Sequence, residues 1–376
     1  MEHAQNGAAA RRGNPRVSGR LGGADGALCA ITDRVSHSVT LIPGDGIGPE
    51  IAAAAVRVLA ATGAVIDWER VECNEKIIRE TGESIPHTVL ASLERTRVGL
   101  KGPITTPVGS GFKSVNVALR KKLDLYANVR PVRSIPNLRT RFSDVKIDMV
   151  IFRENTEDLY SGLEHEIVKD VVTSLKVITR TASTRIAKAA FEYAERTGRK
   201  KVTAIHKANI LKLADGLFLT CSREMAANFP LIEYRELIVD NASMQLVTRP
   251  EQFDVLLLPN LYGDIISDLA AGLVGGLGVV PGANLGDQHA VFESVHGSAP
   301  DIAGKGIANP TALLSSAVMM LEHLGEVKAA GRLQEAMEAV YAEGTHLTAD
   351  VGGKASTDEF ADAVIGKLGS VRELKA

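Results

Sequence analysis

Apolar stretches rich in β-branched residues alternate with amphipathic stretches from about residue 37 onward. The apolar stretches predict strands at 38–44, 64–71, 146–154, 176–182, 201–207 and 253–260. The amphipathic stretches predict helices that begin at Pro49 and that cover 74–82, 183–198, 209–228 and 261–276. This alternation predicts an α/β fold with a largely parallel sheet, whose ligands lie near the carboxyl ends of the strands.

The segment LIPGDGIGPE carries Gly44, Gly46 and Gly48 between a predicted strand and a predicted helix, which is the context of a dinucleotide-binding loop. Its spacing is G-x-G-x-G-P, so Pro49 occupies the place of the third glycine in the Rossmann pattern. Proline suits the first turn of a helix, because its missing N–H has no helical partner there. We therefore predict a strand-to-helix turn at a cleft, with the nucleotide bound elsewhere. The alternative keeps the loop as a nucleotide site, with Asp67 as its ribose-binding acid.

The chain is long enough for two domains, since 45% of its 376 residues are hydrophobic and each half can bury a core. No repeat or low-complexity linker marks a boundary after about residue 40. We predict crossings between the domains at 119–136, which lacks clear periodicity, and at the glycine-rich segment 272–286.

Composition argues against several classes of protein. The net charge of −2 gives no global field that would attract nucleic acid or an anionic membrane, and neither is expected as a partner. Cys29, Cys73 and Cys221 are scattered and form no C-x-x-C pair, which argues against a disulfide framework and a zinc site. The most apolar stretch, 269–286, is interrupted by glycines and Pro281, so no membrane-spanning helix is predicted.

Residues 1–36 are rich in Gly, Ala and Arg and lack apolar periodicity, so a disordered leader is predicted. Its arginines suit a mitochondrial transit peptide, whereas Glu2, Asp25 and the scarcity of serine do not. A cytoplasmic location is therefore predicted, with the mitochondrial matrix as the alternative.

A basic run lies between residues 120 and 146. Its members are Arg120, Lys121, Lys122, Arg130, Arg133, Arg139, Arg141 and Lys146. A charge run alone is typical of a solvated or nucleic-acid-binding surface. This run also contains apolar residues such as Tyr126 and Val129. We therefore predict that its arginines lie among core residues and not on a solvated surface. A guanidinium among core residues usually binds a planar anion, because its two parallel N–H groups can donate to both oxygens of a carboxylate. Arg153, at the end of a predicted strand, offers another such guanidinium.

Asp264 and Asp268 are spaced i and i+4 in GDIISDL, which places both carboxylates on one face of the helix that follows a buried strand. Like charges at this spacing repel unless a cation or an arginine neutralises them. Asp264 alone is also compatible with a helix cap. The pair favours a Mg²⁺ or Mn²⁺ site, since hard divalent ions take oxygen ligands, and Asp240 offers a third oxygen.

Tyr160 and Lys207 each follow an apolar strand and lie near these predicted anion binders. Most tyrosines and lysines are not catalytic, and neither His206 nor His296 by itself indicates a catalytic role. The combination of clustered arginines, paired carboxylates, a tyrosine and a lysine is more specific than any single member.

Several motifs resemble, in the right order, those of the β-decarboxylating hydroxyacid dehydrogenases. They are GDGIGPE, LDLYANVRP, RENTEDLYSG, HKANILK, NLYGDIISDLAAGL and FESVHGSAPDIAGKGIANP, and the resemblance covers about residues 38–365. This family comprises isocitrate, 3-isopropylmalate and homoisocitrate dehydrogenases. The resemblance implies a two-domain isocitrate/isopropylmalate dehydrogenase-like α/β fold, distinct from the Rossmann fold.

The resemblance also implies how the chain is divided and assembled. A large cofactor-binding domain is expected over 37–125 and 275–376, and a small domain with the dimer interface, substrate and metal residues over 126–274. A homodimer or higher homo-oligomer with shared active sites is expected, in which Lys207 and Asp240 reach the partner's cleft.

The resemblance further implies NAD⁺-dependent oxidative decarboxylation of isocitrate in the tricarboxylic acid cycle. Ser114 and Asn116 match the S-x-N arrangement that binds the extra carboxylate of isocitrate. The expected roles are substrate binding by Arg120, Arg130 and Arg153, catalysis by Tyr160, Lys207 and Asp240, and binding of Mg²⁺ or Mn²⁺ by Asp240, Asp264 and Asp268. The alternatives are homoisocitrate or 3-isopropylmalate dehydrogenase, or a non-catalytic regulatory subunit.

The cofactor loop implied by the resemblance is HGSAPDIAGKGIANP. Its expected contacts to NAD are His296, Gly297, Ala299, Asp301, Ile302 and Asn309. Asp301 and Ile302 stand where NADP-linked relatives carry Lys and Tyr, which hold the 2′-phosphate. An acid at this position accepts hydrogen bonds from the ribose hydroxyls and repels a phosphate, so NAD⁺ is the expected cofactor.

Overall fold

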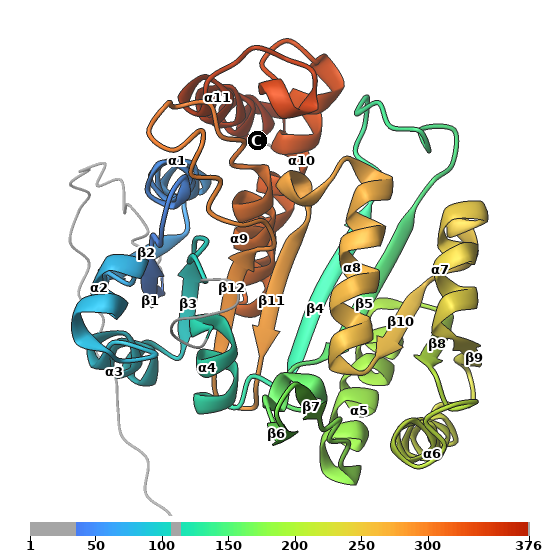
Figure 1. Cartoon of the computed structure of the whole chain (residues 1–376). Coiled ribbons are helices and arrows are strands. Elements are labelled where there is room, and N and C mark those ends of the chain that lie inside the picture. Colours follow the sequence, from blue (N-terminus) through green and yellow to red (C-terminus); the bar gives the residue numbers. More distant parts are fainter. Residues whose placement is uncertain (1–34, 107–113, 375–376) are drawn as a thin grey trace, which may run out of the picture. The chain divides into compact units, whose positions relative to one another are not determined.

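A ten-stranded sheet runs through the part of the chain that the computed structural model describes, residues 35–106 and 114–374 (Figure 1). In spatial order its strands are β2 (Val65–Arg70), β1 (Ser36–Ile42), β3 (Val98–Lys101), β12 (Ala290–Ser294), β11 (Pro281–Leu285), β4 (Ala127–Arg133), β5 (Asp148–Glu154), β10 (Val255–Leu258), β8 (Lys201–His206) and β9 (Glu233–Ile238). The outer strands pair in parallel, whereas β11 and β4 pair antiparallel with each other and with β12 and β5. The predicted α/β class with a largely parallel sheet is confirmed.

Helices cover both faces of this sheet. They are α1 (Gly48–Thr62), α2 (Glu75–Thr81), α3 (His87–Thr96), α4 (Val115–Lys122), α5 (Arg180–Thr197), α6 (Ala214–Ala226), α7 (Val239–Thr248), α8 (Asn260–Val274), α9 (Thr311–His323), α10 (Val327–Glu343) and α11 (Thr357–Leu374). A two-stranded hairpin, β6 (Glu164–Val168) and β7 (Val171–Ser174), is separate from the sheet. No helix in the described ranges is long and apolar enough to cross a membrane. The leader predicted over 1–36 lies outside the described residues up to residue 34.

Alternation along β5 directs its side chains toward two different helices. Phe152 of β5 packs on Tyr193 of α5, with ring centroids 5.1 Å apart, whereas the next residue, Arg153, contacts Asp264 of α8 on the opposite face. Successive side chains of a strand point to opposite faces, so α5 and α8 cover the two sides of β5. Arg153, near the carboxyl end of β5, is therefore the charged residue that this strand presents to α8.

Two predicted elements were wrong in extent. The stretch 176–182 is not a strand: Val177 forms one isolated bridge to Asp158, and α5 already begins at Arg180. The Thr179 side chain accepts a hydrogen bond from the Ala182 amide, and this cap starts the helix where β-branched residues suggested a strand. The helix predicted from residue 209 begins only at Ala214, after a turned segment.

The segments predicted to cross between two domains contain the antiparallel strands β4 and β11, which are neighbours in the sheet. The division into 37–125 with 275–376 and 126–274 stays a prediction.

The glycine turn between β1 and α1 is confirmed. β1 ends at Ile42, α1 begins at Gly48, and Pro49 lies in the first turn of the helix. The turn packs against the segment after β12, since the Ile47 amide donates to the Ser298 carbonyl at 2.9 Å. Asp67 is exposed on the edge strand β2.

Gly46 is predicted to be the least replaceable residue of this turn. Its φ is +58°, and a Cβ built there would lie 1.9 Å from the Ser298 carbonyl oxygen. Gly198 is the matched control, because its φ is +72° but no atom lies within 4 Å of the added carbon. We expect Gly198→Ala to cost about 1 kcal/mol from backbone strain alone, and Gly46→Ala about 2 kcal/mol more. Urea unfolding of the two variants measures this difference; equal losses would contradict the role of packing at Gly46.

Candidate active site

One cavity of about 230 Å³ brings together most of the residues singled out in the sequence. Those that line it are Ser114, Asn116, Arg120, Arg130, Arg153, Tyr160, Asp264, His296 and Gly297. Small-molecule pockets usually measure roughly 300–1,000 Å³ for drug-sized ligands, so this cavity suits a smaller metabolite. The predicted residues that do not line it are Lys207, Asp240, Asp268, Ala299, Asp301, Ile302 and Asn309.

The cavity wall holds buried polar atoms that lack a hydrogen-bond partner within the described residues. They are Asn116 Oδ1, Arg120 Nε, Asn128 Oδ1, Arg130 Nε, Ser294 Oγ and His296 Nε2. Native proteins pair nearly all buried polar groups, so a cluster of unpaired ones around one cavity indicates a polar ligand. Four cations, Lys101, Arg120, Arg130 and Arg153, line the same cavity against two carboxylates, Asp264 and Glu293, and this excess of positive charge favours an anionic ligand.

Arg153 and Tyr160 converge on Asp264. Arg153 donates to one carboxylate oxygen, and the Tyr160 hydroxyl donates to the other at 2.5 Å. Burial and the hydrogen bond to Asp264 raise the pKa of Tyr160 above its usual value. Burial alone would raise the pKa of Asp264, but Arg153, the Tyr160 hydroxyl and Arg130 lower it overall. Tyr160 is therefore protonated and Asp264 ionised at neutral pH.

Asp264 is not a helix cap, because it lies beyond the first turn of α8 and its carboxylate faces the cavity. Asp268, one turn further, accepts a hydrogen bond from Arg130 at 3.2 Å. Burial raises the pKa of Asp268 against the opposing effect of Arg130. The repulsion expected between the two aspartates is thus offset by arginines.

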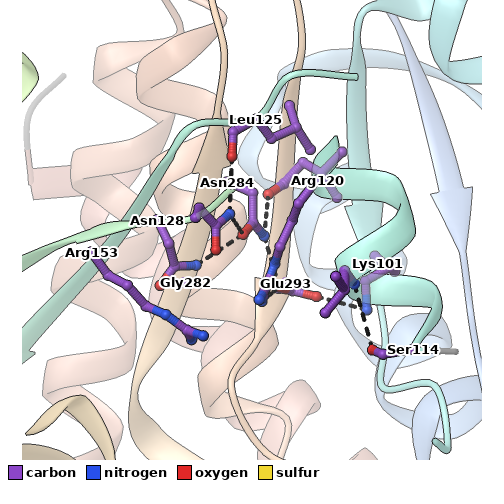
Figure 2. Close-up of polar contacts among 12 residues, drawn as sticks. Lys101, Ser114, Arg120, Leu125, Asn128, Arg153, Gly282, Asn284 and Glu293 are labelled. Atoms are coloured by element: carbon purple, nitrogen blue, oxygen red, sulfur yellow. Dashed lines mark hydrogen bonds and ion pairs between the residues drawn. The ribbon is translucent and has the colours of Figure 1, made fainter. Parts of the chain in front are cut away.

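Sequence reasoning missed a buried ionic network on the other wall of the cavity, which Figure 2 shows. The Glu293 carboxylate lies 2.7 Å from Lys101 Nζ and 3.3 Å from an Arg120 nitrogen. Asn284 donates to the same carboxylate at 2.7 Å and in turn accepts from Asn128 at 2.9 Å. Burial opposes ionisation of Glu293, but Lys101 and Arg120 hold its pKa far below the usual value.

Strand alternation could have marked Lys101 and Glu293 as buried charges, although not as partners of each other. Lys101 and Glu293 each end or nearly end a buried strand, and each follows an apolar residue whose side chain points to the opposite face. A buried cation and a buried anion on adjacent parallel strands, β3 and β12, pair directly in register.

Glu293→Gln is expected to destabilise the protein by about 3–5 kcal/mol, the usual result of leaving buried cations without their partner. The lowered pKa of Glu293 means that its ionised form stabilises the fold above pH 4.5, and that this contribution is lost as the pH falls below 4.5. The difference in unfolding free energy between wild type and variant should therefore shrink in acid. A difference that is constant from pH 7 to pH 3 would contradict this assignment.

Asp264 and Asp268 have the donor chemistry of a divalent-cation site. Both offer carboxylate oxygens on one helix face, and Mg²⁺ commonly binds one or two carboxylates together with water and substrate oxygens. The arrangement thus fits a hard divalent ion. Asp240 does not complete the set within one chain, since no group of three or more His, Cys, Asp or Glu among the described residues is placed to hold a metal ion.

Lys207 and Asp240 form a pair of their own at the carboxyl ends of β8 and β9. Lys207 Nζ lies 2.6 Å from Asp240 Oδ1, and 69% of the Asp240 side chain is exposed. The hydrogen bond from Lys207 lowers the pKa of Asp240. His206 has a local structural partner, since its Nδ1 accepts a hydrogen bond from the Ala208 amide at 3.0 Å.

The predicted cofactor loop joins β12 to α9 and lies against the glycine turn. The Gly306 amide donates to a Glu50 carboxylate oxygen at 3.1 Å. Burial lowers the pKa of His296, which lies where this loop meets the cavity. Asn309 donates to Asp350 at 3.0 Å, so its amide has a structural partner. The roles assigned to this loop stay predictions.

Comparison with known proteins identifies the family. The family model described as isocitrate/isopropylmalate dehydrogenase matches residues 38–364. The chain is 53% identical over 343 residues to the mitochondrial NAD isocitrate dehydrogenase catalytic subunit 5 of Arabidopsis thaliana, covering 91% of each chain. It is 52% identical to a mitochondrial NAD isocitrate dehydrogenase of Dictyostelium discoideum that is named as a regulatory subunit, covering 88% of this chain and 92% of the relative.

Among solved structures, isocitrate dehydrogenase from Methylococcus capsulatus matches with a TM-score of 0.85 and 50% identity, covering 88% of this chain and 99% of that one. The predicted cytoplasmic location is wrong, because curated relatives at this level of identity are named as mitochondrial proteins. Scattered acidic residues in a leader were a poor basis for that prediction. The family match, which covers most of the chain and every residue that lines the cavity, shows that this protein belongs to the isocitrate/isopropylmalate dehydrogenase family.

Proposed function

We propose that this chain is a catalytic NAD⁺-dependent isocitrate dehydrogenase, which converts isocitrate to 2-oxoglutarate and CO₂ in the tricarboxylic acid cycle. The observation that carries the proposal is the cavity with four cations and a set of unpaired buried polar atoms. The names of the curated relatives support isocitrate as the substrate. They also support a mitochondrial location.

Charge and polarity in the cavity favour a tricarboxylate. Arg120 and Arg130 are buried with one guanidinium nitrogen each unpaired within the described residues, so both have donors for substrate carboxylates. Ser114 and Asn116 line the same wall and supply a hydroxyl and an amide. Polar side chains there bind a third carboxylate better than the isopropyl group of 3-isopropylmalate. Homoisocitrate, one methylene longer, is the nearest alternative.

Tyr160, Lys207 and Asp240 are the proposed proton-transferring groups. The Tyr160 hydroxyl keeps its proton at neutral pH and donates it to the carbon that loses CO₂. Lys207 and Asp240 relay the proton that leaves the C2 hydroxyl. Asp264 and Asp268 would hold the divalent cation, which would make the C2 hydroxyl more acidic, and bound NAD⁺ would supply the hydride acceptor.

The pairing of Lys207 with Asp240, apart from the cavity, supports a dimer with shared active sites. Exposed apolar side chains also occur on the separate hairpin and the loop after it, and at Ile265 next to Asp264 on α8. Those of the hairpin region are Leu163, Ile167, Val168, Val171, Val172 and Leu175. Contiguous exposed apolar residues mark association surfaces. A homodimer or higher homo-oligomer is therefore proposed.

Cofactor preference is expected to depend on Asp301 and Ile302. Replacing them with Lys and Tyr removes a negative charge that repels the 2′-phosphate of NADP⁺ and adds groups that bind it. We expect the ratio of kcat/KM for NADP⁺ to that for NAD⁺ to rise by about tenfold or more, which equals ~1.4 kcal/mol. Steady-state kinetics with both cofactors measures the ratio, with the KM for isocitrate as the control. A wild-type enzyme that prefers NADP⁺ would refute the assignment.

The function itself is tested by purifying the chain alone and following NADH absorbance with isocitrate, NAD⁺ and Mn²⁺. A catalytic chain is expected to turn over without other chains. A regulatory chain would bind isocitrate without forming NADH, and one of the curated relatives is named as regulatory.

A further inference from the structure

Two buried aspartates that the proposed reaction does not use share one lysine. Asp158 and Asp215 are fully buried, and only 12% of the Lys176 side chain is exposed. Lys176 Nζ lies 2.6 Å from Asp215 Oδ1 and 3.8 Å from Asp158 Oδ1. It also lies 4.3 Å from the centre of the Tyr262 ring. We call Asp158, Lys176 and Asp215 the ion triad.

Such a triad is costly to bury, because removing each ion from water costs several kcal/mol. The attraction of one ammonium to two carboxylates does not fully offset this cost. Backbone amides supply further hydrogen bonds. Asp158 accepts from Leu159 at 2.8 Å and Leu261 at 3.0 Å. Asp215 accepts from the Lys207 amide at 2.6 Å. Each of these amides belongs to a segment that carries a proposed catalytic group.

Asp158 links the tyrosine segment to the start of α8. Leu159 begins the short helix η1 (Leu159–Ser161) that contains Tyr160, and Leu261 lies in the first turn of α8. The residue before α8, Pro259, makes no side-chain cap, so the Asp158 carboxylate performs that role from another part of the chain. The backbone of Asp158 has a φ of +69°, a strained conformation for a residue other than glycine, and these hydrogen bonds hold it in place. The two elements that meet in the Tyr160–Asp264 hydrogen bond are thus joined a second time.

Asp215 holds the backbone of the segment that carries Lys207. It lies in the first turn of α6 and fixes the backbone of Lys207, whose side chain reaches Asp240. Lys176 lies between the two aspartates and comes from a third segment, the loop between β7 and α5. The ammonium therefore connects two segments of one chain: that of Tyr160, which lines this chain's cavity, and that of Lys207, which in the proposed dimer serves the partner's cavity.

We propose that the ion triad is a positioning device for the reaction, in which Lys176 holds the Lys207 segment in register with the Tyr160 segment and α8. This inference rests on the proposed function. None of the three side chains lines the substrate cavity, so their effect is on the placement of proton-transferring groups and not on the binding of isocitrate.

Lys176→Met tests the proposal, with Lys188→Met as the matched control, since Lys188 is exposed on α5 and its ion pair within the described residues is with Glu192. We expect Lys176→Met to lower kcat by about 30-fold, in line with the large cost of small misplacements, while the KM for isocitrate changes less than about threefold. Lys176→Arg should recover most of kcat. Hydrogen–deuterium exchange over 205–213 and 259–264 should accelerate in Lys176→Met and stay unchanged in Lys188→Met.

Asp215→Asn is the second variant if Lys176→Met fails to fold, because it keeps an acceptor for the Lys207 amide and removes one charge. It should lower kcat in the same way and with the same accelerated exchange. An active wild type with unchanged kcat and exchange in these variants overturns the proposal, as does a loss of stability without a loss of kcat per folded site. If the wild type forms no NADH from isocitrate, the proposed function fails. Exchange over the two segments then still decides whether the triad holds them together.

Discussion

Asp264→Asn should abolish most isocitrate oxidation and weaken Mn²⁺ binding at the same time. The change removes a charged oxygen ligand and leaves Arg153 and the Tyr160 hydroxyl facing a neutral amide. Replacing a residue that only supports a metal ligand typically lowers metal affinity or activity by about 10- to 100-fold. Replacing a ligand itself is therefore expected to lower kcat by at least about 100-fold. Asp268→Asn should act in the same direction. Titration of Mn²⁺ in the presence of isocitrate gives the readout that is independent of turnover.

Asp362→Asn is the matched control, since Asp362 is an exposed aspartate that also pairs with an arginine, Arg57. It should leave both kcat and Mn²⁺ affinity within about twofold of wild type, as exposed ion pairs contribute little. Full activity of the wild type in EDTA would contradict the metal site altogether.

Mixing two inactive variants should restore activity. Lys207→Met and Asp264→Asn are each expected to be inactive, because each removes a group from every site. If sites are shared across a twofold dimer, a mixed dimer has one site with both lesions and one site with neither. Random reassortment makes half of the dimers mixed, so about a quarter of wild-type activity should return.

The restored activity should vanish when the protomers are crosslinked before mixing. Native mass spectrometry of the mixture shows whether mixed dimers have formed. If they form and no activity returns, Lys207 and Asp264 act in the same chain's site and the shared-site proposal is wrong.

The sequence predicted the fold well where hydrophobic periodicity was long or motifs were ordered. The glycine turn was recognised because Pro49 and the shortened spacing contradicted a Rossmann loop, and the turn indeed packs on Ser298. The predicted strand at 176–182 was wrong because the local preference of β-branched residues was outweighed by the Thr179 cap.

The anion cavity was only half predicted. Arg120, Arg130 and Arg153 were visible as cations next to strands, and they do line one cavity. Glu293 and Lys101 were missed because their pairing depends on which strands are neighbours, and β3 and β12 are far apart in the sequence. The ion triad was invisible for the same reason, as its members come from three separate segments.

The most direct measurement of the central claim is NADH formation by the purified chain alone, with Mn²⁺, NAD⁺ and one of three substrates: isocitrate, homoisocitrate or 3-isopropylmalate. We predict turnover with isocitrate and a kcat/KM for it at least about tenfold above that for either analogue, since polar groups meet its third carboxylate. No turnover with isocitrate under conditions where the chain binds it, or faster turnover with 3-isopropylmalate, would contradict the claim.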